Sequence, residues 1–219
     1  MIEMIEQILM AVREAAIFVT QNLPKIGAAV KELISKIPPE VWKPLIEFAT
    51  EGIKALFGTK DTAAEIGEKA RIAAEEGCQP EDFKSTSDYL KHLEEKIQID
   101  RAKFEALTPE EIQARELAGT AIFVQGMEEK CGMPVPTEFL KVVSKIAMSA
   151  STVLRLAEML KTAEVTLDDV IDYLKERCKG DKLEAVDAAF KQAIAADHPD
   201  MDADKINETI LAAQEWLKD

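Results

Sequence analysis

The chain has 219 residues, of which 47% are hydrophobic and 31% are charged, a balance typical of a folded globular protein rather than a disordered one. Its 27 basic and 41 acidic residues give a net charge of −14 at neutral pH. With no segregated basic patch, this charge argues against binding to nucleic acid and against electrostatic docking to anionic lipid.

The composition also predicts the fold class. Aromatic residues make up only 5% of the chain, and the abundant Ala, Glu, Lys and Leu lose little rotamer freedom in a helix. Proline, glycine and capping residues divide the sequence into about nine to ten helices, with no convincing strand. We therefore expect an all-α protein built from helical bundles, without a β-sheet.

The first predicted helix covers about residues 2–22 and carries a regular apolar stripe. The stripe repeats at alternating spacings of three and four residues and consists of Ile2, Ile5, Leu9, Val12, Ala16 and Val19. This spacing is typical of a buried helix seam. A secretory signal would have basic residues where Glu3 and Glu6 stand, and Arg13 interrupts the apolar run. An ordinary core helix and a docking face for another chain both fit the stripe.

Two further helices are predicted before residue 59. The second ends at Pro38, and the third extends to Phe57 with Gly58 as its C-terminal cap. Residues 1–58 hold six basic and seven acidic side chains, whereas residues 59–219 hold 21 and 34. We therefore predict two units: an apolar three-helix N-terminal unit, 1–58, and an acidic helical body, 59–219.

The body begins with an Ala-rich helix that closes at Gly77. A longer polar segment follows, with a bend or break expected near Asp100. Thr108 and Glu111 form a capping box with Pro109 at the first helical position, and the helix that they start should end near Gly132. The uncharged runs of the chain reach at most eleven residues, well short of the ~20 that a membrane span requires.

A second strongly periodic helix is expected over residues 139–160, because its apolar residues again alternate at spacings of four and three. Its middle, residues 147–152, is rich in small side chains, as is the stretch 117–126. We expect these two helices to cross in the centre of the body. Further helices should run from Thr166 to Gly180, from Asp181 to Ala196, and from about residue 203 to Leu217.

The acidic stretch before the last helix resembles the start of a calcium loop, with Asp200, Asp202 and Asp204 in alternate positions. Lys205 stands where the loop requires glycine and Leu211 where it requires a bidentate glutamate. We therefore interpret Asp202 as a helix cap. The glycines form none of the nucleotide, phosphate or serine-hydrolase motifs, and we expect no cofactor and no metal.

Three cysteines, Cys78, Cys131 and Cys178, lie 53 and 47 residues apart. That spacing fits neither a disulfide framework nor a zinc motif, and it predicts reduced thiols in a cytoplasmic protein. The chain has only two histidines, so the candidate residues for an unrecognised enzyme are Cys131, His92 and His198.

These observations favour a non-enzymatic helical protein that acts through protein–protein interaction. The stripe residues of the first helix are the candidate interaction residues, either for self-association or for a partner protein. The acidic body would suit an inhibitor or chaperone-like accessory of a basic partner. One alternative is a peripheral membrane protein that uses residues 1–58 as an amphipathic hairpin; the unrecognised enzyme is the other.

Overall fold

The computed structural model describes residues 39–218, and this part of the chain is all-helical, with no strand. The helices are α3 (Pro39–Phe57), α4 (Ala63–Glu75), the 3₁₀-helix η2 (Pro80–Asp82), α5 (Thr86–Lys96), α6 (Arg101–Glu105), α7 (Pro109–Cys131), α8 (Thr137–Lys145), α9 (Ala150–Thr162), α10 (Leu167–Leu174), α11 (Asp181–Asp197) and α12 (Ala203–Lys218). The all-α prediction is confirmed.

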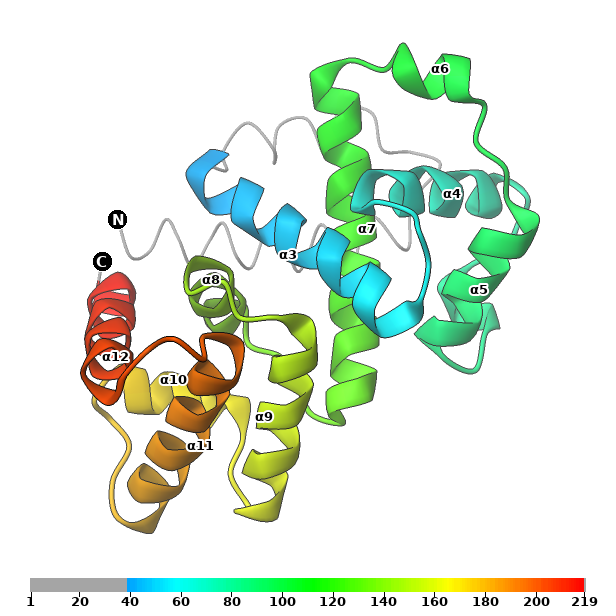
Figure 1. Cartoon of the computed structure of the whole chain (residues 1–219). Coiled ribbons are helices and arrows are strands. Elements are labelled where there is room, and N and C mark those ends of the chain that lie inside the picture. Colours follow the sequence, from blue (N-terminus) through cyan, green and yellow to red (C-terminus); the bar gives the residue numbers. More distant parts are fainter. Residues whose placement is uncertain (1–38, 219) are drawn as a thin grey trace.

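Helix α7 is the long central element, and helices pack against it along its length (Figure 1). It contacts α3, α4, α5 and α9. Helices α4, α5 and α7 form a first group of packed helices. Helices α8 to α12 form a second group, which pack on one another at the lower left of Figure 1. Helix α3 contacts members of both groups, α4 and α7 in one and α8 and α9 in the other, so it joins them into one continuous core.

The apolar face of α3 lies inside that core. Leu45, Phe48, Ala49 and Ile53 are buried, and the ring of Phe48 meets the ring of Phe123 edge to face at 5.5 Å between centroids. The first two predicted helices and the stripe lie outside the described residues. The division at residue 58 therefore stays a prediction, although α3 itself packs into the core of the body.

Local sequence signals set several helix ends. The Thr108 side chain accepts a hydrogen bond from the Glu111 N–H at 3.3 Å, and Glu111 Oε2 accepts one from the Thr108 N–H at 2.9 Å, which confirms the capping box. Helix α7 then ends at Gly132 in the left-handed conformation. The predicted break near Asp100 is also confirmed, since that carboxylate caps α6 by accepting from the Lys103 N–H.

The single helix predicted over residues 139–160 is wrong: the structure divides it into α8 and α9. Ala147 adopts a positive φ of 54° between them, and Ser149 starts α9 as its N-cap by accepting a hydrogen bond from the Thr152 N–H. Apolar residues on both sides of the break, such as Val143 and Val153, are buried in the same core. The periodicity therefore continues through a chain that is not one helix.

The predicted crossing of the two small-residue stretches is only partly right. Helix α9 does contact α7, but the glycines of α7 fit against other helices. A Cβ atom placed on Gly119 would lie 1.9 Å from the Ala63 carbonyl oxygen of α4, and one on Gly126 would lie 2.5 Å from the ring of Phe57 in α3. The small residues of α7 thus admit α4 and α3.

Helix α10 is shorter than predicted, ending at Leu174 rather than near Gly180. Glu176 takes a positive φ of 57°, and the Arg177 and Cys178 N–H groups both donate to the Asp172 carbonyl. This turn leads directly into α11. Helix α12 starts as predicted, with Asp202 Oδ1 accepting from the Lys205 N–H at 2.9 Å.

Candidate functional site

The end of helix α4 fixes the position of Cys78. Gly77 has a φ of 81°, its N–H donates to the Ala74 carbonyl, and the Cys78 N–H donates to the Ala73 carbonyl at 2.9 Å. This is the Schellman arrangement, which closes a helix through a left-handed glycine. The chain then turns into η2, and the half-buried Cys78 thiol faces the next helix.

His92 meets Cys78 from helix α5. Its Nε2 atom lies 3.6 Å from the Cys78 Sγ atom, and its ring stacks at a tilt on Phe83, with 5.1 Å between centroids. Phe83 also contacts Tyr89, one turn earlier on α5, at 5.2 Å. The thiol, the imidazole and the two aromatic rings therefore form one cluster, which we call the Cys78–His92 site.

The electrostatics of the site oppose an ionised thiol. Burial, together with the negative charges of Asp82 and Glu76, raises the pKa of the Cys78 thiol. A nucleophilic cysteine needs the opposite shift, toward a stable thiolate beside its histidine. The contact between Cys78 and His92 therefore does not create an activated cysteine nucleophile.

Tyr89 is the most buried member of this cluster. Its side chain is fully buried, and its hydroxyl has no hydrogen-bond partner among the described residues. Burial raises the pKa of the phenol well above its usual range, with smaller contributions from Cys78 and Glu81. Its hydroxyl is protonated at physiological pH, as that of an ordinary tyrosine is.

The three residues singled out for an unrecognised enzyme serve separate parts of the fold. Cys131 is buried at the end of α7, where burial raises the pKa of its thiol to about 11 despite the nearby Lys161. His198 Nε2 contacts the Ile146 carbonyl oxygen at 2.8 Å. Within residues 39–218 no hydrogen bond joins Cys131 to either histidine, whereas His92 contacts Cys78. All three cysteines are free thiols.

A serine, an aspartate and a histidine do meet where α11 ends, but not in the order of a catalytic triad. Asp197 accepts hydrogen bonds from the Ser149 N–H, the Ser149 hydroxyl and the Thr152 hydroxyl, at 2.5, 2.9 and 2.7 Å. His198 turns to the Ile146 carbonyl instead of to Ser149. The pair Asp197–His198 therefore clamps the turn between α8 and α9, and it leaves the serine without a base.

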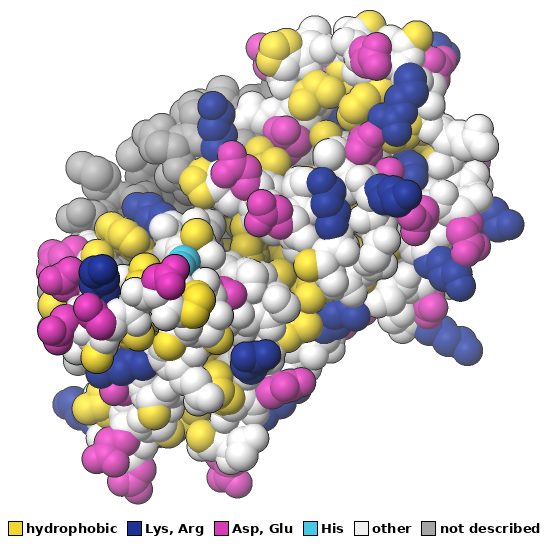
Figure 2. Space-filling model, in the orientation of Figure 1, with side chains coloured by type: hydrophobic (Ala, Val, Ile, Leu, Met, Phe, Trp, Pro, Cys, Tyr) yellow, Lys and Arg dark blue, Asp and Glu magenta, His cyan; other side chains and the backbone are white. Residues whose placement is uncertain are grey.

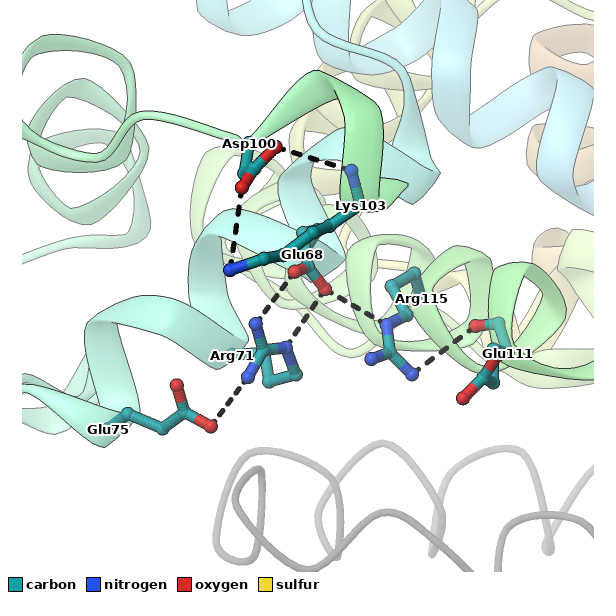
Figure 3. Close-up of polar contacts among 7 residues, drawn as sticks. All are labelled: Glu68, Arg71, Glu75, Asp100, Lys103, Glu111 and Arg115. Carbon is teal, nitrogen blue, oxygen red and sulfur yellow. Dashed lines mark hydrogen bonds and ion pairs between the residues drawn. The ribbon is translucent and has the colours of Figure 1, made fainter. Parts of the chain in front are cut away.

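The densest group of charges lies between α4 and α7 (Figure 3). Glu68 receives Arg71 through two hydrogen bonds, at 2.9 and 2.7 Å, and Arg115 through a third, at 3.0 Å. Arg71 also reaches Glu75 at 2.5 Å, while Asp100, which caps α6, forms a separate pair with Lys103 of that helix. Each arginine of the group is paired with a carboxylate, so this network binds the two helices together.

A multidentate metal centre is not present in the part of the chain that the structure describes. No group of three or more His, Cys, Asp and Glu side chains comes together there in a way that could hold a metal ion. The Cys78–His92 site thus stands out as a pair of ligand-type side chains rather than a complete centre. Sequence spacing alone does not reveal it, since the two residues share no known motif.

The candidate interaction residues Ile2, Ile5, Leu9, Val12, Ala16 and Val19 lie outside the described residues. No helix within residues 39–218 is both long and apolar enough to cross a membrane. Comparisons with known proteins give no family model, no curated protein and no solved structure that matches the chain.

Proposed function

We propose that this is a non-enzymatic, cytoplasmic protein that acts through protein–protein interaction, with the apolar stripe of residues 2–19 as its docking element. Self-association and capture of a hydrophobic partner helix both use such a face. One observation carries the proposal. Among the described residues, the large hydrophobic side chains that are exposed are Leu183 and Leu211, at 40% and 60%, so this part of the chain presents no extended apolar face for docking.

The packing of α3 strengthens this interpretation. Its apolar face is already buried against α7, α8 and α9, so α3 anchors the N-terminal segment to the body and is not available as a docking face. The same finding weakens the membrane-hairpin alternative, because a hairpin of residues 1–58 would have to withdraw α3 from the core. Docking would fall to residues 1–38.

The test uses the full chain, since a truncation at residue 59 would remove α3 and open the core. We expect wild-type protein to form a dimer or larger oligomer by light scattering, or to capture a partner in a pull-down. Leu9→Glu combined with Val12→Glu should abolish that association while leaving a folded, helical monomer by circular dichroism. The matched control is Gln7→Glu, on the polar side of the same predicted helix, which should leave association unchanged.

A monomeric wild-type chain that captures no partner, together with a lower melting temperature of the stripe variant, would contradict the proposal. The stripe would then be an ordinary core helix.

The charge of the body suggests the class of partner within this proposal. Acidic side chains are visible in the region of α12, at the left of Figure 2. At the start of this helix, Asp200, Asp202, Asp204 and Glu208 are exposed beside a single lysine, Lys205. Exposed charges attract an oppositely charged surface over about 10 Å at moderate salt. A basic partner is therefore the form of the proposal that this surface supports, and its capture should weaken as the salt concentration rises.

A further inference from the structure

The spacing of the Cys78–His92 site matches the spacing of two ligands on one metal ion. Zinc binds thiolate at about 2.3 Å and imidazole at about 2.0 Å in a tetrahedral arrangement, which places the two ligand atoms about 3.5 Å apart. Cys78 Sγ and His92 Nε2 are 3.6 Å apart. Both side chains are partly exposed, so water can reach the remaining coordination positions.

The two ligands are also held in place before any ion arrives. The backbone of Cys78 is fixed by the Schellman hydrogen bonds, and the imidazole of His92 rests on the ring of Phe83. Helix α5, which carries His92, is secured at its start by Glu129 of α7, whose carboxylate accepts hydrogen bonds from Thr86 N–H and Thr86 Oγ1 at 2.8 and 2.7 Å. Binding would therefore require little rearrangement of the chain.

The charges around the thiol separate a metal site from a nucleophile. The exposed carboxylates Glu76 and Asp82 lie near Cys78. Their negative charges favour the binding of a cation, either a proton or a metal ion, to the thiolate sulfur. A bound proton contributes one positive charge and a zinc ion two. The same carboxylates that disfavour a free thiolate therefore favour the replacement of the thiol proton by a divalent cation.

We propose that Cys78 and His92 bind a thiophilic divalent metal ion such as Zn²⁺, with water in the other positions. Binding forms an S–metal bond and an N–metal bond, and it releases the thiol proton to solvent. With two protein ligands instead of the four of a structural zinc site, the ion is exchangeable, and the fold does not depend on it.

The test is a titration of the full chain with Co²⁺, whose thiolate complexes absorb in the near ultraviolet, followed by displacement with Zn²⁺. We expect a thiolate–cobalt band in the wild type and in Cys178→Ser, the control that removes the other half-exposed cysteine. The band should be lost in Cys78→Ser. His92→Ala should weaken binding at least about tenfold, and His92→Cys should retain it because a second thiolate is also a zinc ligand.

A second measurement needs no substitution. Zn²⁺ should slow alkylation of Cys78 in the wild-type chain, mapped by mass spectrometry, while leaving the alkylation rate of Cys178 unchanged. Absence of a thiolate–cobalt band in the wild type, an unchanged band in Cys78→Ser, or equal protection of both cysteines would overturn the proposal. Binding to His92→Ala as tight as to the wild type would show that the imidazole is not a ligand.

Discussion

Asp197 is the side chain on which the turn between α8 and α9 depends. Its carboxylate lies at the end of α11 and accepts three hydrogen bonds from Ser149 and Thr152, residues 45 and 48 positions earlier in the chain. The neighbouring His198 contacts the carbonyl of Ile146 on the other side of the same turn. Two consecutive residues therefore hold both ends of a tight connection in which Ala147 has a positive φ.

Replacing Asp197 with alanine should destabilise the protein by about 2 kcal/mol, because hydrogen bonds to a charged group contribute about 1.5–3 kcal/mol and the Ser149 N–H would lose its partner. Chemical denaturation at neutral pH measures this loss. Asp200→Ala, an exposed carboxylate three residues away, should change the free energy of unfolding by no more than about 0.5 kcal/mol. Equal effects of the two substitutions would rule out the clamp.

At the scale of the helices, the contact between α4 and α7 is the tightest feature of the fold. Gly67 of α4 faces the backbone of Arg115, and Gly119 of α7 faces the backbone of Ala63, each with room for no Cβ atom. The two contacts are four residues apart on both helices, so each helix offers one glycine to the other. The Glu68 network lies beside this contact and ties the same two helices by charge.

Gly119→Ala tests this contact, because two effects oppose each other. Alanine is favoured over glycine in a helix by about 1 kcal/mol, but its Cβ would lie 1.9 Å from a carbonyl oxygen, and backbone cannot move aside without shifting α4. Overpacking of this kind costs about 1–3 kcal/mol or more. We expect a net loss of about 2 kcal/mol by thermal or chemical unfolding, whereas Gln125→Ala, exposed on the same helix, should be neutral. A stabilised Gly119→Ala would contradict the packing.

The helices were predictable where their signals are local, and unpredictable where distant residues decide. Thr108, Gly77 and Asp100 each act within a few residues of the helix end that they set. The sequence predicts the capping box at Thr108, the helix end at Gly77 and a break near Asp100, although not the capping role of Asp100. The break at Ala147 depends on Asp197, 50 positions later. The Cys78–His92 site depends on a Schellman turn followed by η2, whose combined geometry no spacing rule contains. The apolar periodicity of residues 139–160 predicts a single helix wrongly, because it indicates which residues are buried and not whether the helix is continuous.

For the whole molecule, the excess of 14 negative charges makes stability depend on how carboxylates are paired. Burial alone would raise the pKa of Glu68, but its hydrogen bonds from Arg71 and Arg115 outweigh that effect and lower the pKa. The pKa values of Glu65 and Asp169 are lowered in the same way by their hydrogen-bond partners. Burial raises the pKa of Glu116, so its charge opposes folding at neutral pH.

These shifts predict a two-part response to acid. A carboxylate whose pKa is lowered by folding contributes stability that is complete above its unfolded pKa, about 4.3 for Glu and 3.9 for Asp, and is lost as the pH falls through its folded pKa. Protonation of Glu116, whose pKa is raised by burial, and the declining net charge act in the opposite direction as the pH falls toward the unfolded pKa of Glu. We therefore expect the free energy of unfolding to stay level or rise slightly down to about pH 5, and to fall steeply below about pH 4.5.

The substitution Glu68→Gln tests the part of the network in this response. It should lower the free energy of unfolding by about 1–2 kcal/mol at pH 7 and should make the fall below pH 4.5 shallower, as followed by urea denaturation at several pH values. The control is Glu94→Gln, at an exposed position on α5, which should keep the wild-type dependence on pH. A Glu68→Gln profile parallel to that of the wild type would mean that the network does not cause the loss of stability in acid.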